Sequence, residues 1–203
     1  MVKITETEVT GWRHAIRGMR NALESWDKSD SVQGCSGFKI GENDLALMKK
    51  LVKAGDDHAK FMRYITVYCD CLGPWFWWKE YDTYKIGTVA NSCSTMHTIH
   101  KRDLTADDFS CEDNLFWGNL NHTIDAINYA RKMYLETKDK QWWYSMIQLL
   151  PSSFNQKRTL MLNYQVLRHI YHARKNHKLK EWHIFCDWIR SLPYSELITG
   201  EEN

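Results

Sequence analysis

The sequence has little net charge, no long apolar run and no signal-peptide pattern at its N-terminus. Each absence excludes a class of partner or location. The 27 Lys and Arg residues nearly balance the 25 Asp and Glu residues, which leaves a formal charge of +2. That charge points neither to nucleic acid nor to an anionic membrane as a partner. The apolar runs are much too short to cross a bilayer, and the first residues lack the layout of a signal peptide. We therefore expect a soluble cytoplasmic protein without a membrane partner.

Motifs that mark several common enzyme classes are also missing. The sequence has no Gly-x-Ser-x-Gly elbow, no phosphate-binding P-loop and no Gly-x-Gly-x-x-Gly run. Its six cysteines lack the paired spacing of a metal site, so we expect no metal and interpret them as free buried thiols in a reducing cytoplasm. Cys69 and Cys71 alternate in a β-rich run and are expected on one face of a strand. Cys93 has no Cys-His-Asn context, so a covalent cysteine mechanism is not expected.

What the sequence does have is length and aromatic residues. Its 203 residues can bury roughly 70% of their unfolded surface in one core. No internal repeat, linker or low-complexity tract divides them, so we expect a single α+β domain over residues 1–203. Ten tryptophans and ten tyrosines exceed what such a core requires. Some are expected to line a ligand site or an interface between subunits.

Apolar spacing predicts strands and helices in mixed order. Strands are expected at 2–9 and 63–72, and helices at 12–26, 43–54, 120–134 and 142–150. Residues 25–41, with their Ser, Asp and Gly, are predicted to form a mobile loop. Pro151 ends the helix before it. A last helix is expected from about residue 159 to about residue 190, broken or bent near residue 176.

The most informative segment begins at a Leu-Pro turn, Leu150-Pro151. Asn163, Leu167, Ile170 and Arg174 follow at helical spacing, so an amide and a guanidinium are predicted on one face with aliphatic residues. A rise of about 1.5 Å per residue would place Asn163 and Arg174 roughly 16 Å apart, which suits two parts of an extended ligand. The alternative is an amphipathic helix whose Asn and Arg lie at a wet boundary.

This ordered set, continued by His177 and Glu181, resembles the C-terminal signature of the flavin-dependent thymidylate synthases. That signature has Leu-Pro, a dozen residues, Asn-Ala-Arg-Ser-Leu, and then Arg, His and Glu on one helix. The resemblance implies an α+β fold with an antiparallel sheet and long amphipathic helices. It also implies a homotetramer in which FAD and a pyrimidine nucleotide bind between subunits.

A second, weaker match lies upstream. Pro74-Trp-Phe76 matches the family's Pro-x-Phe at the end of a strand, and Lys79-Glu80 stands where the family has Arg-Gln. Thr83-Tyr84-Lys85 takes the place of an Arg-His-Arg triplet that helps to hold the flavin and the nucleotide. Lys85 alone is a single-point substitute for bidentate guanidinium groups, so FAD is expected to bind more weakly or in an altered pose. His58, near Phe61, resembles the His before the family's Pro-Phe.

The resemblance implies a flavin-dependent one-carbon transfer. Methylenetetrahydrofolate would provide the methyl carbon for C5 of a dUMP-like nucleotide, with FAD as cofactor and NADPH as reductant. Arg174 is the expected catalytic residue, because a guanidinium beside the uracil carbonyls would polarise the ring. The residues expected to bind the cofactor are Asn163, His177, Lys85 and His58. Those expected to bind the substrate are Ser94, Gln165 and Lys79, with uncharged Gln165 standing where the family has a phosphate-binding Arg.

Two other function classes stay open. The first is a flavin-free protein that keeps this fold and binds nucleotides or nucleic acid, as exposed Trp with Lys and Arg would allow. The second is a structural oligomer whose tryptophans pack subunit contacts. The sequence also leaves open whether Trp75, Trp77 and Trp78 stack on a ligand or form a buried aromatic layer.

Two sets of charged residues also admit alternatives. Asp82, near Glu80 and Lys85, is either an acid–base pair or a wet surface charge. The second set either compensates for the missing cationic triplet or lies on a solvated face; its members are Arg158, Arg168, Lys175, Lys178 and Lys180.

Overall fold

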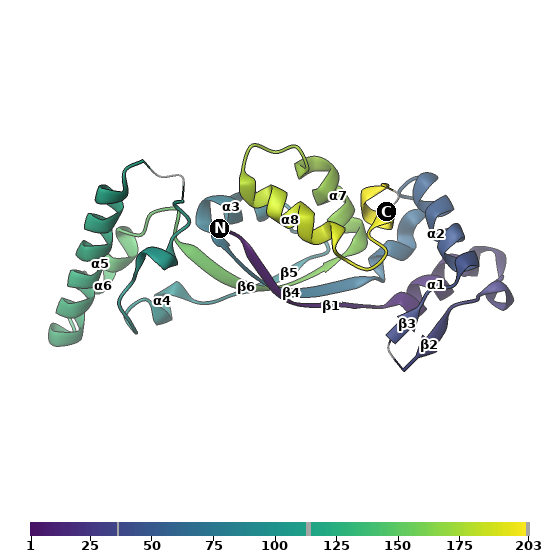
Figure 1. The fold of residues 1–203 in the computed structure, drawn as a ribbon. Helices are drawn as coiled ribbons and strands as arrows, with labels where there is room; N and C mark the ends of the chain where they lie inside the picture. The colour runs from purple at the N-terminus through teal and green to yellow at the C-terminus, as the bar shows by residue number, and fades with distance from the viewer. Residues whose placement is uncertain (36, 113–114, 202–203) are drawn as a thin grey trace. The chain divides into compact units, whose positions relative to one another are not determined.

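The computed structural model describes residues 1–35, 37–112 and 115–201, and its fold is α+β with an antiparallel sheet, as predicted. The main sheet has the strand order β1-β4-β6-β5 and a smaller sheet pairs β2 with β3. The strands are β1 (Lys3–Thr10), β2 (Val32–Gly34), β3 (Gly37–Lys39), β4 (Thr66–Pro74), β5 (Val89–Ser92) and β6 (Asn155–Asn163). The helices are α1 (Trp12–Arg20), α2 (Glu42–Lys53), α3 (Trp75–Tyr81), α4 (Thr95–Thr98), α5 (Trp117–Thr137), α6 (Lys140–Gln148), α7 (Tyr164–Arg174), α8 (Lys180–Arg190) and α9 (Glu196–Thr199) (Figure 1). Short 3-10 turns are η1 (Asn21–Leu23), η2 (Trp26–Lys28), η3 (Ala59–Arg63) and η4 (Ala106–Asp108).

The chain divides into two compact units. The first unit consists of Met1–Lys3, Asp70–Thr83 and Asn91–Thr159, and the second of Ile4–Cys69, Tyr84–Ala90 and Leu160–Asn203. Strands of the main sheet pass from one unit into the other, since the boundary falls inside β1, β4, β5 and β6. The single domain expected over residues 1–203 stays a prediction.

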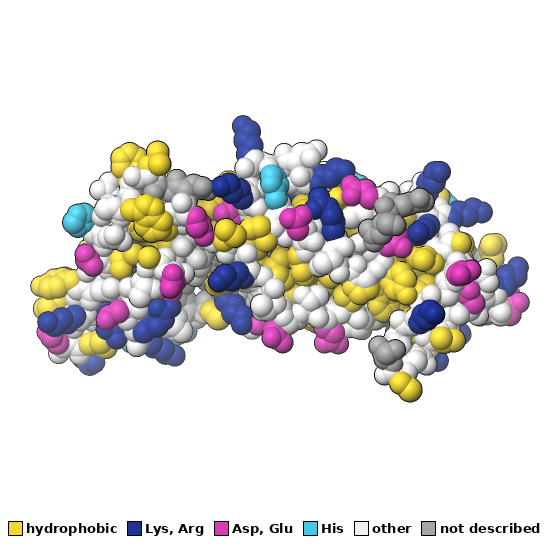
Figure 2. Space-filling view, viewed as in Figure 1, with side chains coloured by type: hydrophobic (Ala, Val, Ile, Leu, Met, Phe, Trp, Pro, Cys, Tyr) yellow, Lys and Arg dark blue, Asp and Glu magenta, His cyan; other side chains and the backbone are white. Residues whose placement is uncertain are grey.

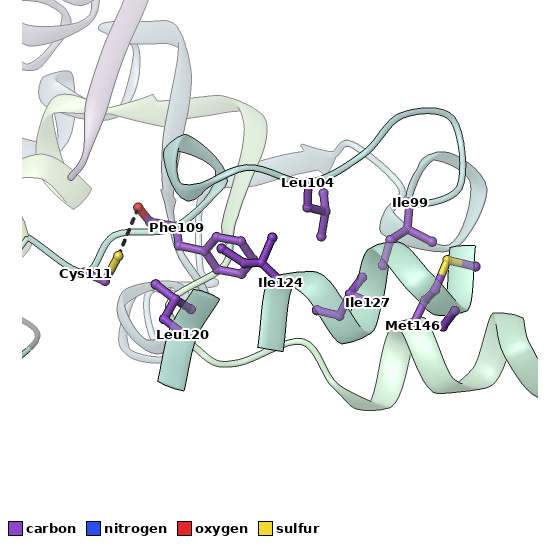
Figure 3. Packing of buried hydrophobic residues seen from close by; sticks show 9 residues of the cluster. Ile99, Leu104, Phe109, Cys111, Leu120, Ile124, Ile127 and Met146 are labelled. Atoms are coloured by element: carbon purple, nitrogen blue, oxygen red, sulfur yellow. Dashed lines mark hydrogen bonds between the residues drawn. The ribbon is translucent and has the colours of Figure 1, made fainter. Parts of the chain in front are cut away.

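The core of the first unit lies against two helices, α5 and α6, which are side by side (Figure 1). Ile124, Ile127 and Ala130 follow one another at helical spacing along α5 and are all buried, while Met146 of α6 is fully buried opposite them. Figure 3 shows this cluster, in which Leu104, Phe109 and Leu120 also take part. The predicted helices at 120–134 and 142–150 are therefore confirmed, with α5 longer than expected.

Helix α3 contributes an aromatic layer to the same unit. Trp77 and Trp78 are 0% and 1% exposed, and their ring centroids lie 4.7 Å apart. The indole N–H of Trp78 donates to the carbonyl oxygen of Gln156 at 2.9 Å, which satisfies its polar atom inside the core. Trp75 is half-buried and packs edge-on against Phe154 at 5.3 Å. Trp77 and Trp78 thus form the buried layer and do not face a ligand.

The core of the second unit is built around α7. Leu167 and Ile170 are fully buried, as the aliphatic stripe of this segment predicted. Helix α7 packs against η3, α8 and α9, and α1 packs against η3. Figure 1 shows α8 beside α7. The predicted strand at 2–9 is confirmed by β1, and the predicted helix at 43–54 by α2. The predicted strand at 63–72 corresponds to β4, shifted towards Pro74.

The expectation of one helix from about residue 159 is wrong at its beginning. Residues up to Asn163 form β6, in which Leu160 and Leu162 are buried while Thr159 is exposed. This alternation has the two-residue period of a strand. Helix α7 begins only at Tyr164, and it ends at Arg174 before α8 begins at Lys180. Asn163 therefore does not share a helix face with Arg174.

Two further expectations about the N-terminal part need correction. The helix predicted at 12–26 ends at Arg20 and gives way to η1 and η2. The loop predicted at 25–41 contains the β2–β3 hairpin, with Val32 opposite Lys39 and Gln33 opposite Phe38. Backbone pairing here comes from only three residues in each strand, which is too short for an apolar pattern to signal.

Cys69 and Cys71 are both buried on the same face of β4, as predicted. All six cysteines are free, but Cys35 and Cys93 are exposed, so the expectation of buried thiols is wrong for these two. Figure 2 shows Lys and Arg interspersed with Asp and Glu over the visible face, in keeping with the small net charge. None of the helices in the described residues combines the length and apolar character that a bilayer crossing requires.

Candidate functional site

The site residues of the second unit gather around the two ends of α7, and Asn163 fixes its start. Asn163 has extended backbone angles, and its Oδ1 accepts a hydrogen bond from the backbone N–H of Val166 at 3.0 Å. This is the N-cap arrangement, which satisfies one of the N–H groups that the first helical turn leaves unpaired. The amide is therefore part of the helix terminus. Its expected contact with a cofactor stays a prediction.

The same amide holds the segment that contains Lys85. Asn163 Nδ2 donates to the carbonyl oxygen of Gly87 at 3.5 Å. Gly87 has a φ of +76°, and a Cβ placed on it would lie 3.2 Å from Asn163 Nδ2 and 3.3 Å from Val166 Cγ2. Only glycine meets both conditions without strain. Residues 84–90 are thereby held against the start of α7.

The end of α7 carries Arg174, which lies among aromatic side chains. Its Nε–H donates a 2.8 Å hydrogen bond to the phenolic oxygen of Tyr84. Its guanidinium carbon lies 4.8 Å from the ring centroid of Trp182 and 5.6 Å from that of Tyr84. Trp182 is fully buried, so it forms a rigid surface under the half-buried guanidinium. Arg174 is thus a positioned cation and not a solvated surface charge.

His177 lies beside the same tryptophan. Its ring centroid is 6.3 Å from that of Trp182, at an interplanar angle of 73°. Its Nδ1 accepts from the backbone N–H of Leu179 at 3.2 Å, which in the neutral ring places the proton on Nε2. Trp182 therefore brings together two residues that the sequence singled out, Arg174 and His177.

Gln165 begins a polar network on the first turn of α7. It is 4% exposed, and its Nε2 lies 3.3 Å from His169 Nε2, which in turn lies 3.2 Å from Asp56 Oδ2. Hydrogen bonds from His169 and from Gln165 hold the pKa of Asp56 below its usual value. Within the described part of the chain, the enclosed Oε1 of Gln165 has no hydrogen-bond partner. A buried acceptor without a donor is costly, and it marks a place where a ligand would be favoured.

Lys85 and His58 are exposed in the second unit. The segment holding Lys85 is closed by Thr88, whose hydroxyl donates to the carbonyl oxygen of Tyr84 at 2.9 Å. His58 precedes η3, the 3-10 turn that packs on α7, and lies two residues from Asp56. Their predicted roles in cofactor binding are not tested by these contacts.

The other two predicted residues, Ser94 and Lys79, lie in the first unit. Ser94 is half-buried and precedes α4, where its carbonyl oxygen accepts from the hydroxyl of Thr98 at 2.8 Å. Lys79 is exposed on α3. Their roles in substrate binding stay predictions.

Two of the cations that were candidates to replace the missing triplet, Arg158 and Arg168, are already engaged. Arg158 NH1 donates to Asp82 Oδ1 at 2.7 Å, and its guanidinium carbon lies 4.2 Å from the ring centroid of Trp78. Asp82 is therefore the partner of a structural arginine, and the pattern of an acid–base pair with Lys85 receives no support. Arg168 lies 3.5 Å from Asp56 Oδ1 and donates to the carbonyl oxygen of Val52 at 3.4 Å.

Sequence reasoning missed several partners of Arg174 and Gln165. Tyr84 occupies the middle of the triplet that carries the family resemblance, so its position was a usable signal. Trp182 and Asp56 carried no signal, because their contacts arise only when α8 and the segment before η3 lie against α7. His169 lies one helical turn after Gln165, so its spacing was a usable signal. Among the described residues, no group of three or more His, Cys, Asp and Glu could hold a metal ion.

Comparison with known structures identifies the architecture. Thymidylate synthase X from Helicobacter pylori, solved with FAD and dUMP, superposes with a TM-score of 0.75 and 16% identity over 99% of this chain and 98% of that one. The chain has the fold of the flavin-dependent thymidylate synthases. A second structure of the H. pylori enzyme, described as flavin-dependent ThyX complexed with FAD and dUMP, gives 0.72 and 16% over 97% and 98%.

A third neighbour with the ThyX fold is the UMP/dUMP methylase PolB from Streptomyces cacaoi, bound with 5-Br dUMP. It gives a TM-score of 0.63 and 14% identity over 98% of this chain and 94% of that one. No protein-family model matches the sequence, and no curated protein matches it either. The similarity to these solved structures is therefore detected from the three-dimensional fold and not from the sequence comparisons.

Proposed function

We propose that the chain is a flavin-dependent enzyme that transfers a one-carbon unit to C5 of a dUMP-like nucleotide. The observation that carries the proposal is the fixed position of the Arg174 guanidinium, which Tyr84 and Trp182 contact. Solved structures with this fold contain dUMP or 5-Br dUMP. Methylenetetrahydrofolate is the proposed carbon donor and NADPH the proposed reductant. The proposed assembly is a cytoplasmic homotetramer, as the family resemblance implies.

Arg174 has the chemistry for the central role. A nucleophilic C5 requires an enolate-like ring with negative charge on the pyrimidine carbonyls, and a fixed guanidinium stabilises that charge without reorganising. Tyr84 fixes the orientation of the guanidinium through Nε, and Trp182 excludes water from one of its faces. A positioned group of this type is worth a few kcal/mol in the transition state.

One atom of the site, Gln165 Oε1, is suited to bind a flavin or pyrimidine ring. Both rings carry an imide N–H, and the unpartnered Oε1 of Gln165 is an acceptor that needs such a donor. A phosphate oxygen would not satisfy it. Gln165 is thus proposed to contact a ring or a sugar hydroxyl, and the phosphate-binding role of the family's arginine does not pass to it.

FAD would be held by Asn163, His177, Lys85 and His58, with Ser94, Gln165 and Lys79 on the nucleotide. Bound reduced FAD would supply the hydride chemistry of the reaction. The chain's own groups supply orientation: Asn163 positions the 84–90 segment, and His177 presents Nε2 beside Trp182. With Lys85 in place of a cationic triplet, and Arg158 and Arg168 engaged elsewhere, FAD should bind more weakly than a full triplet would allow.

A flavin-free nucleotide-binding protein with the same fold is the second candidate. The observation that favours it is Thr83-Tyr84-Lys85 in place of Arg-His-Arg, because Lys85 alone then replaces a group of three basic residues. It predicts nucleotide binding with no retained or added flavin.

One preparation tests both candidates. Purified protein is stripped of any cofactor and titrated with FAD by calorimetry. It is then incubated with FAD, NADPH, methylenetetrahydrofolate and dUMP, and the nucleotide is analysed by mass spectrometry for a gain of one methyl group. A methylated product supports the proposal. Binding of dUMP without any FAD binding at high micromolar concentration would move the assignment to the flavin-free candidate.

A further inference from the structure

A cavity of about 580 Å³ lies in the second unit, entirely within residues 13–38. It lies between α1 and the β2–β3 hairpin, which Figure 1 shows beside that helix. Arg13 and Arg17 of α1 line it together with Trp26 and Phe38. None of these residues belongs to the proposed thymidylate synthase-like site. The volume falls in the range of sites that bind small organic ligands.

The floor of the cavity is a buried ion pair. Arg20 Nε donates to Asp44 Oδ1 at 2.6 Å, and the two side chains are 5% and 0% exposed. The remaining donors of Arg20 bond the carbonyl oxygens of Ser25 and Lys28 at 3.2 and 3.1 Å. Arg20 therefore fixes the loop that carries the cavity wall, and its charge is already neutralised.

The cavity rim has positive charge without an ion-pair partner among the described residues. Arg13, His14 and Arg17 are exposed, and in the described part of the chain no carboxylate lies within salt-bridge distance of Arg13 or Arg17. Glu8, Glu24 and Asp27 are the acids closest in sequence to these arginines; all three are exposed, and none is among the described residues that line the cavity. Two further acids, next to the lining residues, have other partners. Asp44 accepts from Arg20, Ser29 and Ser31, and Asp30 accepts from the first backbone N–H groups of α2. None of the described residues that line the cavity is acidic, so its local charge favours an anion.

Aromatic side chains stand beside these cations. The indole N–H of Trp26 donates to Asn21 Oδ1 at 2.9 Å, which fixes its ring, and the guanidinium carbon of Arg17 lies 5.4 Å from its centroid. Trp26 remains 41% exposed. Phe38 lies opposite Gln33 in the hairpin register, so an apolar face and an amide come from one cross-strand pair. The cavity thus combines a ring surface, a planar hydrogen-bonding group and two guanidinium groups.

We propose that this cavity binds a phosphorylated nucleobase. The base would stack on Trp26, with Phe38 on the hairpin side and Gln33 at its polar edge, and Arg13 and Arg17 would bind the phosphate. Arginine suits this task because its planar fork matches phosphate geometry and stacks on aromatic rings. The same chemistry is presented by a free nucleotide and by a nucleotide in a single strand.

The test measures binding by calorimetry with AMP as the probe, because a purine offers a large stacking face. Adenosine and inorganic phosphate are titrated separately, and a short oligodeoxythymidylate distinguishes a strand from a free nucleotide. Arg17→Gln and Trp26→Leu each change an exposed side chain, so the fold should remain intact, and thermal melting checks this. The control variant is Lys132→Gln. Lys132 is an exposed residue of α5 in the first unit, so this change removes one positive charge outside the cavity.

We expect AMP to bind more tightly than adenosine or phosphate alone. Arg17→Gln and Trp26→Leu should each weaken AMP binding about tenfold or more, with no change in Lys132→Gln. Arg174→Lys should leave AMP binding unchanged, and the loss of AMP binding in Arg17→Gln and Trp26→Leu would assign the nucleotide to this cavity. The result therefore does not depend on whether the protein methylates dUMP.

Two results would overturn the proposal. Phosphate that binds as tightly as AMP, with no effect of Trp26→Leu, would make the cavity a simple anion site. AMP binding that Arg174→Lys abolishes and Arg17→Gln leaves intact would place the nucleotide elsewhere. Tighter binding of the oligonucleotide than of AMP, lost in both cavity variants, would support the proposal and identify a strand as the source of the ligand.

Discussion

The Nε–H of Arg174 donates a 2.8 Å hydrogen bond to the hydroxyl of Tyr84, a residue 90 positions earlier in the chain. Tyr84→Phe removes the acceptor and keeps the ring. We expect a loss of about 0.5–1.5 kcal/mol in unfolding free energy, since one hydrogen bond is removed. If Arg174 polarises the substrate, turnover should fall roughly tenfold to a hundredfold, because the guanidinium is no longer aimed. Steady-state kinetics and denaturant unfolding on the same protein measure both effects.

Tyr144→Phe serves as the control for that change, because Tyr144 is 56% exposed on α6. It should alter neither turnover nor stability. Equal turnover in Tyr84→Phe and wild type would remove Tyr84 from the site.

Arg174→Lys tests the catalytic role itself. Lysine keeps the charge and an apolar stem, so folding and FAD affinity should remain close to wild type. Transfer to dUMP should nevertheless fall by about two orders of magnitude, because one point charge does not reproduce a planar donor pair. Melting temperature, FAD affinity and product formation are measured together. Unaltered turnover would contradict the assignment, and Arg63→Lys, at an exposed position, is the matched control.

Gly87→Ala tests how the 84–90 segment is held. The residue has a φ of +76°, and its new Cβ would crowd Asn163 and Val166 at 3.2 and 3.3 Å. The left-handed conformation alone should cost about 1–2 kcal/mol. Gly55→Ala shares the positive φ, at +108°, but meets no atom within 4 Å. Thermal melting should therefore show a larger loss for Gly87→Ala, and equal losses would mean that the contact with Asn163 is unimportant.

Asp44→Asn should be among the most destabilising single changes in the second unit. It leaves Arg20, 5% exposed, without its counter-charge, a situation that costs about 3–5 kcal/mol. Asp103→Asn breaks an ion pair in which Asp103 is 66% exposed, and should cost less than about 1 kcal/mol. Chemical denaturation compares the two. A similar small loss in both variants would show that the buried pair contributes little.

The buried carboxylate of Asp44 should make the unfolding free energy of the protein depend on pH. Burial alone would raise the pKa of Asp44, but hydrogen bonds from Ser31, Ser29 and Arg20 outweigh it, and the pKa lies below its usual value. The stabilisation is therefore present above the unfolded-state pKa of about 3.9, and it is lost as pH falls through the lower folded-state value. Wild type should lose stability more steeply than Asp44→Asn below about pH 4.

Asp56 offers a direct titration near α7. Hydrogen bonds from His169 and Gln165 lower its pKa, so His169→Ala should raise the pKa towards the ordinary carboxyl value. Carboxyl-carbon NMR titration follows the group itself. His172→Ala, which changes an exposed histidine on the same helix, should leave the Asp56 titration in place. An unshifted Asp56 in His169→Ala would contradict the network.

The sequence allowed much of the fold to be predicted where the apolar period is long. The buried stripe of α7 and the apolar spacing in α2 identified their helices. Residues three apart, such as Leu167 and Ile170, share one buried face in a helix. The β6–α7 boundary was misplaced because Thr159 to Asn163 suits both periods, and only pairing in the sheet selects the strand. Local pattern alone does not contain that long-range term.

The candidate site was predictable to a smaller extent. Arg174 and His177 stood out by type and order, and the structure places both beside Trp182. Asn163 was interpreted as a ligand-facing amide, whereas its Oδ1 caps α7. Asparagine serves both purposes, and the difference depends on where the helix begins. Tryptophan counts were similarly ambiguous, since Trp77 and Trp78 belong to the core while Trp26 remains exposed.

The distribution of thiols has a practical consequence. Cys35 lies in the second unit and Cys93 in the first, and both are exposed, whereas the other four cysteines are buried. A maleimide spin label or fluorophore applied to the native protein should therefore attach at these two positions without any engineered substitution. The doubly labelled chain then carries one reporter on each unit. Pulsed electron resonance or energy transfer between the reporters would measure the distance between the units in solution, with and without nucleotide.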